Sequence, residues 1–167
     1  ASVGEFHYIH HQTDGTPYDD LGELSVRIAA AAATTGIGLT HLPVLYTYGG
    51  AGKVPLEAGQ ARFGNSVDGF NDLVARTEQV VASLPTDCRV GIAPHSLRAT
   101  SPDDLAAVLQ SYSSGPKHIH IAEQPKEVVD ITAWLGARPV EWLLDNVEVG
   151  KDWCLIHATH MTDVETN

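Results

Sequence analysis

The stretch HIHIAEQ, residues 118–124, places two histidines two positions apart in a short apolar run and closes with a glutamate and an amide. Successive side chains of a β-strand point to opposite faces, so His118 and His120 share one face and Ile119 and Ile121 share the other. The isoleucines predict that one face of this strand is buried. The histidines indicate that the opposite face carries chemistry.

Short apolar runs of strand length alternate with helical segments through the rest of the chain. Strands are expected at residues 2–9, 38–46, 88–94, 117–123 and 153–158. Helices are expected at residues 20–34, 68–84, 101–110 and 125–147, the last broken near 136–139. The glycine-rich segment 49–65 between the second strand and the second helix predicts a long loop, either substrate-covering or mobile.

Capping residues support these boundaries. Ser101, followed by a proline and two aspartates, has the pattern of a helix start, and Asp68 is the expected cap of the preceding helix. Gly36 is expected to end the helix before that one. In that first helix the predicted buried face consists of Leu21, Leu24, Ile28 and Ala31.

Strands that alternate with helices predict a parallel sheet with right-handed crossovers, either an open doubly wound sheet or part of a (β/α)8 TIM barrel. In a barrel, reactive side chains gather where the strands end, because those ends share one mouth. Five predicted strands end in this way, at Tyr8 with His10 and His11, at Tyr46, at His95 with Arg98, at His120 with Glu123, and at His157. We therefore expect an α/β fold that is a partial (β/α)8 barrel of about five parallel strands.

The amino-acid composition disfavours two classes of function, nucleic-acid binding and membrane insertion. The formal charge is −11, with 10 Lys plus Arg against 21 Asp plus Glu, which disfavours a nucleic-acid partner because phosphate binding needs clustered cations. Cys88 and Cys154 are expected to be buried free thiols. No apolar stretch approaches the ~20 residues that cross a bilayer, so a cytoplasmic protein without a membrane partner is expected.

The HIHIAE pattern contains groups that can serve a metal site, although one histidine cannot hold a metal ion by itself. Neutral imidazole is a common ligand for zinc or another divalent ion, and a glutamate three residues after His120 can approach a metal-bound water without binding the metal itself. A single buried histidine is more often a structural residue, and His41 within its strand is interpreted in that way. Recurrence of polar residues at successive strand ends favours the catalytic interpretation for the others.

The segments GEFHYIHH, LPVLY, APHSLRA, HIHIAEQ and CLIHATH, in this order, resemble the amidohydrolase superfamily, and most closely its formimidoylglutamate deiminase family of histidine degradation. The resemblance runs from about residue 2 to the C-terminus. It implies a metal-bearing (β/α)8 barrel in which this chain corresponds to strands two to six. It also implies hydrolysis of formimidoylglutamate to formylglutamate and ammonia.

The resemblance implies a role for each matching residue. His120 is the metal ligand on the fifth barrel strand, Glu123 is the acid/base, and His157 orients or deprotonates the attacking water. His95 and Arg98 bind substrate, with Arg98 facing a substrate carboxylate, and Tyr8 joins them. One divalent ion, expected to be zinc, and a small carboxylate-bearing substrate complete the site.

The chain departs from the family pattern at both ends. The paired first-strand histidines are absent before Tyr8 and the eighth-strand aspartate is absent after His157, so residues 1–167 are expected to be one barrel segment truncated at both ends and inactive alone. Unpaired edge strands predict homo-oligomer formation. Two alternatives stay open. The first is a related amidohydrolase, namely a guanine-type deaminase, a chlorohydrolase-like deaminase or an imidazolonepropionase. The second is a non-catalytic α/β module.

Overall fold

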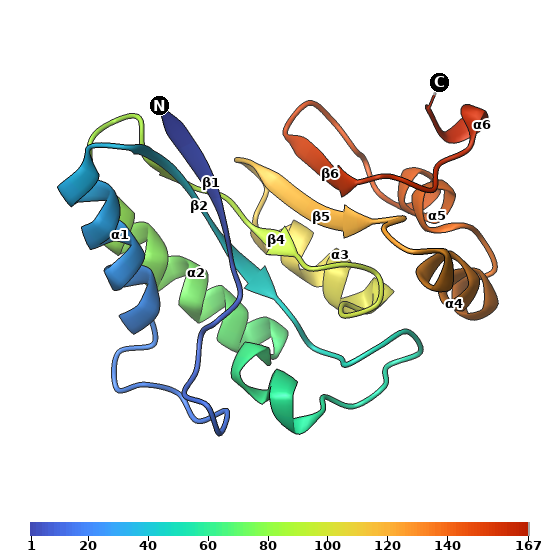
Figure 1. Ribbon diagram of the computed structural model, residues 1–167, viewed down its shortest axis with the longest axis horizontal. Helices are drawn as coiled ribbons and strands as arrows, with labels where there is room; N and C mark the ends of the chain where they lie inside the picture. The colour runs from blue at the N-terminus through green and yellow to red at the C-terminus, as the bar shows by residue number, and fades with distance from the viewer. Residues whose placement is uncertain (167) are drawn as a thin grey trace.

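A row of parallel strands forms the framework of the protein. In Figure 1, α1 and α2 lie to the lower left of the strands, α3 lies beneath β4 and β5, and α4 and α5 lie to the right. The computed structural model describes residues 1–166, and Asn167 lies outside the described residues. The strands are β1 (Ser2–His7), β2 (Gly38–Leu45), β3 (Arg89–Val90), β4 (Ala93–Pro94), β5 (Lys117–Ile121) and β6 (Trp153–His157). The N-terminus and the last described residues lie on opposite sides of the view.

The strands follow their sequence order across the sheet. β1 pairs with β2, β2 pairs with both β3 and β4, and β5 pairs with β6, every pair being parallel. Backbone hydrogen bonds join the two halves, from His118 N to Ile92 O at 3.0 Å and from Ile92 N to Pro116 O at 2.9 Å. This confirms parallel strands that alternate with helices.

The third predicted strand is split into β3 and β4, which both pair with β2 and are separated by Gly91 and Ile92. Gly91 still donates to β2, at His41 O, whereas Ile92 bonds toward β5. A Cβ atom on Gly91 would lie 2.5 Å from Pro116 O and 2.6 Å from a methyl group of Leu42. Only glycine allows the three strands to approach this closely.

Helix α1 (Glu23–Thr35) ends, as predicted, at Gly36, which adopts the left-handed conformation at φ 68°. The predicted buried face of this helix is wrong: its buried residues are Ser25, Ala29 and Ala32, and Ala31 is exposed. The alanine-rich sequence has no dominant apolar stripe, so small side chains that permit close packing determine the buried face.

Helix α2 (Val67–Val81) also starts differently from the prediction. Its cap is Ser66, whose Oγ accepts from Gly69 N at 3.2 Å, and Asp68 lies in the first turn instead. An acidic residue there still suits the positive end of the helix dipole. Ser101 caps α3 (Pro102–Ser111) as predicted.

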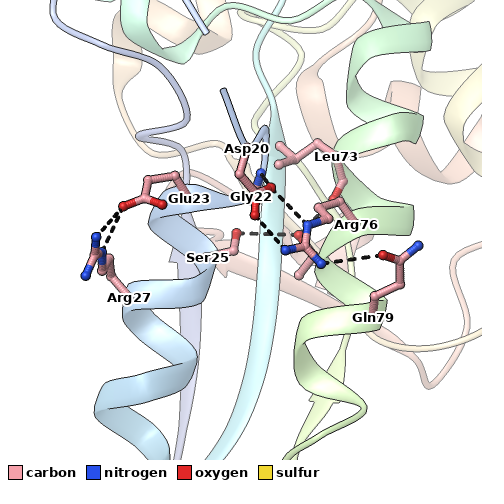
Figure 2. Close-up of polar contacts among 9 residues, drawn as sticks. Asp20, Gly22, Glu23, Ser25, Arg27, Leu73, Arg76 and Gln79 are labelled. Carbon is pink, nitrogen blue, oxygen red and sulfur yellow. Dashed lines mark hydrogen bonds and ion pairs between the residues drawn. The ribbon is translucent and has the colours of Figure 1, made fainter. Parts of the chain in front are cut away.

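An ion pair joins α2 to the segment before α1, as Figure 2 shows. Asp20 accepts two hydrogen bonds from Arg76, at 2.9 Å from Nε and 2.6 Å from Nη2. The Arg76 hydrogen bond lowers the pKa of Asp20 to about 2. Asp20 also accepts from Gly22 N, at 2.9 Å, so one carboxylate holds the start of α1 against α2.

The C-terminal half forms the larger core cluster. It contains α4 (Pro125–Leu135), α5 (Pro139–Asn146) and α6 (Asp163–Thr166), and the break between α4 and α5 lies where the sequence predicted it. Ile119 and Ile121 of β5 are fully buried in this cluster, while His118 and His120 face the other side of the sheet. The predicted alternation in HIHI is confirmed.

The sheet is an open arc within the described residues. Its outer strands, β1 and β6, carry the exposed backbone edges, and most residues of β2 between them are buried.

Both cysteines are free, but Cys88 is half-buried and Cys154 is exposed, so the prediction that both are buried is wrong. None of the helices in residues 1–166 has the length and apolar character needed to cross a membrane.

The long loop predicted at residues 49–65 contains a short 3-10 helix, η1 (Ala58–Phe63). The loop runs below β4 and β5 in Figure 1. Gln60 of η1 donates to the Tyr46 hydroxyl at 3.1 Å, so this loop is attached to the end of β2.

Candidate active site

His120 lies at the centre of the polar strand ends. Its backbone N–H donates to His95 O at 2.9 Å, which aligns β5 with the segment that follows β4. The His120 and His95 rings stack with centroids 5.3 Å apart and an interplanar angle of 18°. His157, at the end of β6, places its ring centroid 5.2 Å from that of His120.

Aromatic rings surround these imidazoles on the β1 and β2 side. Phe6 meets the His120 ring edge to face at a centroid distance of 4.3 Å. Tyr46 and Tyr8 approach His95, at 4.6 Å and 6.1 Å between centroids. Apolar walls of this kind strengthen electrostatic interactions inside the site.

Glu123 lies between a cation and an imidazole. Its Oε2 accepts from Arg98 Nη2 at 2.7 Å, and its Oε1 lies 3.7 Å from His157 Nε2. Partial burial alone would raise the pKa of Glu123, but the hydrogen bond and charge of Arg98 outweigh it, so the pKa is lowered overall. The carboxylate is therefore ionised at neutral pH and can accept a proton.

Burial keeps two of the imidazoles neutral. It lowers the pKa of His95 to about 3, with the nearby His120 and Arg98 acting in the same direction. Burial is also the largest cause of the lowered pKa of His120. Neutral imidazole is the form that binds a metal ion.

The ring nitrogens of His120 and the surrounding side chains show how far the described residues fit the expected metal ion. The Nδ1 of His120 is buried and has no hydrogen-bond partner among the described residues, so no described protein group competes for that nitrogen. No group of three or more His, Cys, Asp or Glu side chains within residues 1–166 is arranged to hold a metal ion. The described residues thus fit part of a metal site and do not form a complete one.

The backbone is strained where β5 and β6 end. Ala122, His157 and Ala158 have φ values of 49°, 69° and 48°, a region that costs a non-glycine residue about 1–2 kcal/mol. The two turns bond to each other, from Ala158 N to Ile121 O and from His160 N to Ala122 O, both at 3.0 Å. Such strain at strand ends is typical of functional sites.

A cavity of about 370 Å³ borders this cluster. Its lining includes His95, Arg98 and Tyr46, but Glu123, His120 and His157 lie outside it. The cavity therefore adjoins these ionisable groups without enclosing them. Its volume lies within the usual range for small-molecule sites.

The six residues to which the family resemblance gives roles meet in this region: His95, Arg98, His120, Glu123, His157 and Tyr8. The His10 and His11 pair does not join them, although it follows the same strand as Tyr8. His10 Nε2 bonds to Val44 O and His11 Nε2 bonds to Gly64 O, both at 2.9 Å. These two buried histidines belong to a separate cluster on the helix side of β1 and β2.

His118 lies deeper on the same face as His120. A side chain at Gly4 of β1 would lie 3.8 Å from His118 Cε1, whereas Phe6, two residues further along β1, contacts His120. The two histidines thus share one face of β5, as predicted, and occupy successive layers along it. His41 is buried and its Nε2 lies 3.0 Å from Ser25 Oγ of α1, which confirms a helix-facing core histidine.

The sequence interpretation missed several contributors to the site. Phe6 and Phe63 form part of the aromatic surroundings, and Glu127 places a buried carboxylate behind Glu123. Strand alternation could have indicated Phe6, which precedes Tyr8 by two positions. Glu127 could be recognised in the sequence only as an acidic residue in the first turn of a helix. Such residues are common at protein surfaces, so this signal does not identify a buried residue of the site.

Comparison with known proteins gives a clear relative by sequence. The chain is 47% identical over 166 residues to a formimidoylglutamate deiminase of Pseudomonas aeruginosa. The match covers 99% of this chain and 36% of the relative, so the chain spans about a third of that enzyme's length. No protein-family model matches the chain.

Solved structures give the same result for the fold. The chain superposes on an amidohydrolase from Brucella melitensis with a TM-score of 0.96 and 53% identity, covering 99% of this chain and 37% of that one. A triazine hydrolase from Arthobacter aurescens gives a TM-score of 0.72 at 17% identity, covering 98% of this chain and 35% of that one. The second likeness concerns the fold alone.

Proposed function

Because this chain belongs to the amidohydrolase superfamily, we propose that it forms the central part of an enzyme that hydrolyses a C–N bond other than a peptide bond. The proposed reaction converts formimidoylglutamate to formylglutamate and ammonia. In this proposal residues 1–167 correspond to strands two to six of a (β/α)8 barrel whose remaining strands close the arc. The exposed edges of β1 and β6 support such a closure.

The observation that carries this proposal is the position of Glu123. Its carboxylate lies 2.7 Å from an arginine and 3.7 Å from His157, and the His157 ring lies 5.2 Å from that of His120. An ionised carboxylate beside two imidazoles can accept a proton from water and deliver it to nitrogen.

We assign His120 to a divalent ion, proposed to be zinc. The support is a neutral, partly buried imidazole with a ring nitrogen that lacks a protein partner. When bound, such an ion lowers the pKa of a coordinated water to about 7. The other ligands would come from outside the described residues.

The chain's own residues then act in a defined order. His157 orients the attacking water, and Glu123 removes a proton from it as the oxygen adds to the formimidoyl carbon. Glu123 next delivers that proton to the terminal nitrogen of the formimidoyl group. It then transfers the remaining hydroxyl proton of the tetrahedral adduct to the same nitrogen, so that the C=O bond forms, the bond from carbon to the terminal nitrogen breaks and ammonia leaves. Arg98 keeps Glu123 ionised before the first step, in line with the lowered pKa of that carboxylate.

Arg98, His95 and Tyr8 are proposed to hold the substrate. Arg98 and His95 line the cavity of about 370 Å³, and Tyr8 approaches His95 from the β1 side. A guanidinium can bind a carboxylate through two parallel hydrogen bonds, which favours the glutamate portion of formimidoylglutamate over a neutral heterocycle.

The test is an ammonia-release assay on the complete gene product that contains this sequence. With zinc supplied, we expect turnover of formimidoylglutamate and at least about 100-fold lower kcat/KM for guanine, because a guanidinium left without its carboxylate is costly. Preference for guanine would contradict the substrate assignment. Absence of any hydrolysis, together with absence of bound metal, would favour a non-catalytic module.

A further inference from the structure

Glu127 is a buried carboxylate to which the proposed mechanism gives no role. It is the third residue of α4 and is 2% exposed, with its side chain completely covered. Charged groups are rarely buried in this way unless they are paired and hydrogen-bonded. The hydrogen bonds and charge partners of Glu127 therefore indicate the structural role of its carboxylate.

Both oxygens of Glu127 accept backbone hydrogen bonds from two consecutive residues. Oε1 accepts from Ala122 N at 3.0 Å, and Oε2 accepts from Glu123 N at 2.9 Å. These two residues connect β5 to α4, and Ala122 has the left-handed φ of 49°. The carboxylate thus fixes a strained turn at the point where the Glu123 side chain leaves the backbone.

Glu127 also faces the arginine that binds Glu123. Its Oε2 lies 3.8 Å from Arg98 Nε, a buried nitrogen that has no hydrogen-bond partner among the described residues. Arg98 Nη2 meanwhile donates to Glu123. One guanidinium is therefore placed between two carboxylates, a buried one behind it and a solvent-facing one in front.

We infer that Glu127 is a positioning residue, which aims the Glu123 carboxylate through the backbone and holds Arg98 against it. This inference rests on the proposed function, since it assigns Glu127 to the same reaction. A helix-capping residue without a catalytic consequence would have the same backbone bonds. The two interpretations differ in what they predict for turnover.

The decisive variant is Glu127→Gln in the complete gene product. A glutamine retains one acceptor oxygen, but its NH₂ group would face the second backbone N–H, and its neutral amide cannot pair with Arg98. We expect kcat for formimidoylglutamate to fall about 10- to 100-fold with KM changed less than about threefold, because outer-shell partners act on geometry. Glu127→Asp, which keeps the charge but shortens the reach, should give an intermediate kcat.

Glu141→Gln is the matched control. Glu141 is the third residue of α5, which also begins with proline, and it accepts from Arg138 N at 3.3 Å, but it is exposed and has no contact with His120, Glu123 or Arg98 among the interactions of the described residues. We expect wild-type kcat for this variant. Thermal unfolding of all three variants identifies the folded ones.

Each outcome separates the two interpretations. Folded Glu127→Gln, or folded Glu127→Asp if the first does not fold, with kcat within twofold of wild type would overturn the inference, as would failure of both variants to fold. A wild-type protein without deiminase activity would instead reject the proposed function. In that case crystal structures of the wild type and of Glu127→Gln test the inference. A longer distance between Glu123 Oε1 and His157 Nε2 in the variant would support positioning by Glu127, and an unchanged distance would refute it.

Discussion

Arg98 and Glu123, 25 positions apart in the sequence, form a hydrogen-bonded ion pair of 2.7 Å between Nη2 and Oε2. The same arginine is the proposed binder of a substrate carboxylate. In the proposed function, substrate binding and placement of the general base would therefore share one guanidinium. A substrate that engages Arg98 would also affect the group that transfers the proton.

Glu123→Gln should remove proton transfer and leave the fold intact. The amide is nearly the same size but cannot accept a proton at neutral pH, so we expect kcat to fall about 10²- to 10⁴-fold. Steady-state ammonia release and thermal unfolding measure the two effects. Glu148→Gln, an exposed acidic residue near the other end of the strands, should retain wild-type kcat. Equal activity of the two variants would contradict the assigned role.

Arg98→Lys should weaken binding of substrates that carry a carboxylate. A lysine ammonium is a point charge that cannot donate two parallel hydrogen bonds, and loss of one charge-assisted bond predicts an increase in KM of about 10- to 100-fold. A formamidine-type substrate without carboxylates should show no such increase, although kcat should fall for both because Glu123 is held less firmly. An equal KM effect on both substrates would show that Arg98 does not bind the carboxylate.

His120→Asn should reduce metal content, measured by elemental analysis of the purified complete gene product. We expect retained zinc to fall at least about 10-fold, since a ligand is lost. His118→Asn is the matched control, because His118 shares the strand and the face but lies one layer deeper. Chelation of wild-type protein should abolish turnover, and zinc should restore it. Greater zinc loss from His118→Asn than from His120→Asn would reverse the assignment.

Local patterns predicted the elements of the fold because each pattern had a local physical cause. The alternation in HIHI follows from strand geometry, and Ser101 caps α3 through its own side chain. Gly36 ends α1 because the left-handed conformation is required there. The prediction failed where tertiary packing decides, as in the buried face of the alanine-rich α1 and the split between β3 and β4 at Gly91.

The convergence of the polar side chains of the site was predictable from the sequence, but their individual contacts were not. Polar residues at successive strand ends indicated that Arg98, Glu123 and His157 would share one mouth. Nothing in the sequence indicated that Arg98 pairs with Glu123, or that Glu127 holds the turn behind it. Such pairings depend on side-chain directions across segments far apart in the chain, which spacing does not determine.

A buried histidine cluster behind β1 and β2 predicts acid sensitivity. The His7 ring lies 5.0 Å from that of His41 and 5.4 Å from that of His10. Burial lowers the pKa of His7 to about 4 and those of His10 and His41 to about 3. In the unfolded chain these imidazoles titrate near 6.5.

These pKa values determine the sign and the range of the pH effect on stability. The three imidazoles are neutral in the folded state and become protonated in the unfolded state below about pH 6.5, so the free energy of unfolding should decrease as the pH falls toward 4. Each contributes a slope of about 1.4 kcal/mol per pH unit within that range.

The His41→Gln variant tests this prediction. Its glutamine keeps a nitrogen donor near Ser25 but cannot titrate, so the free energy of unfolding should fall less steeply with pH than in wild type, by about 1.4 kcal/mol per pH unit. Urea unfolding between pH 5 and 6 measures this slope, and His160→Gln, a partly exposed site, serves as the control. If His41→Gln and wild type lose stability at the same rate, protonation of His41 does not contribute to acid unfolding.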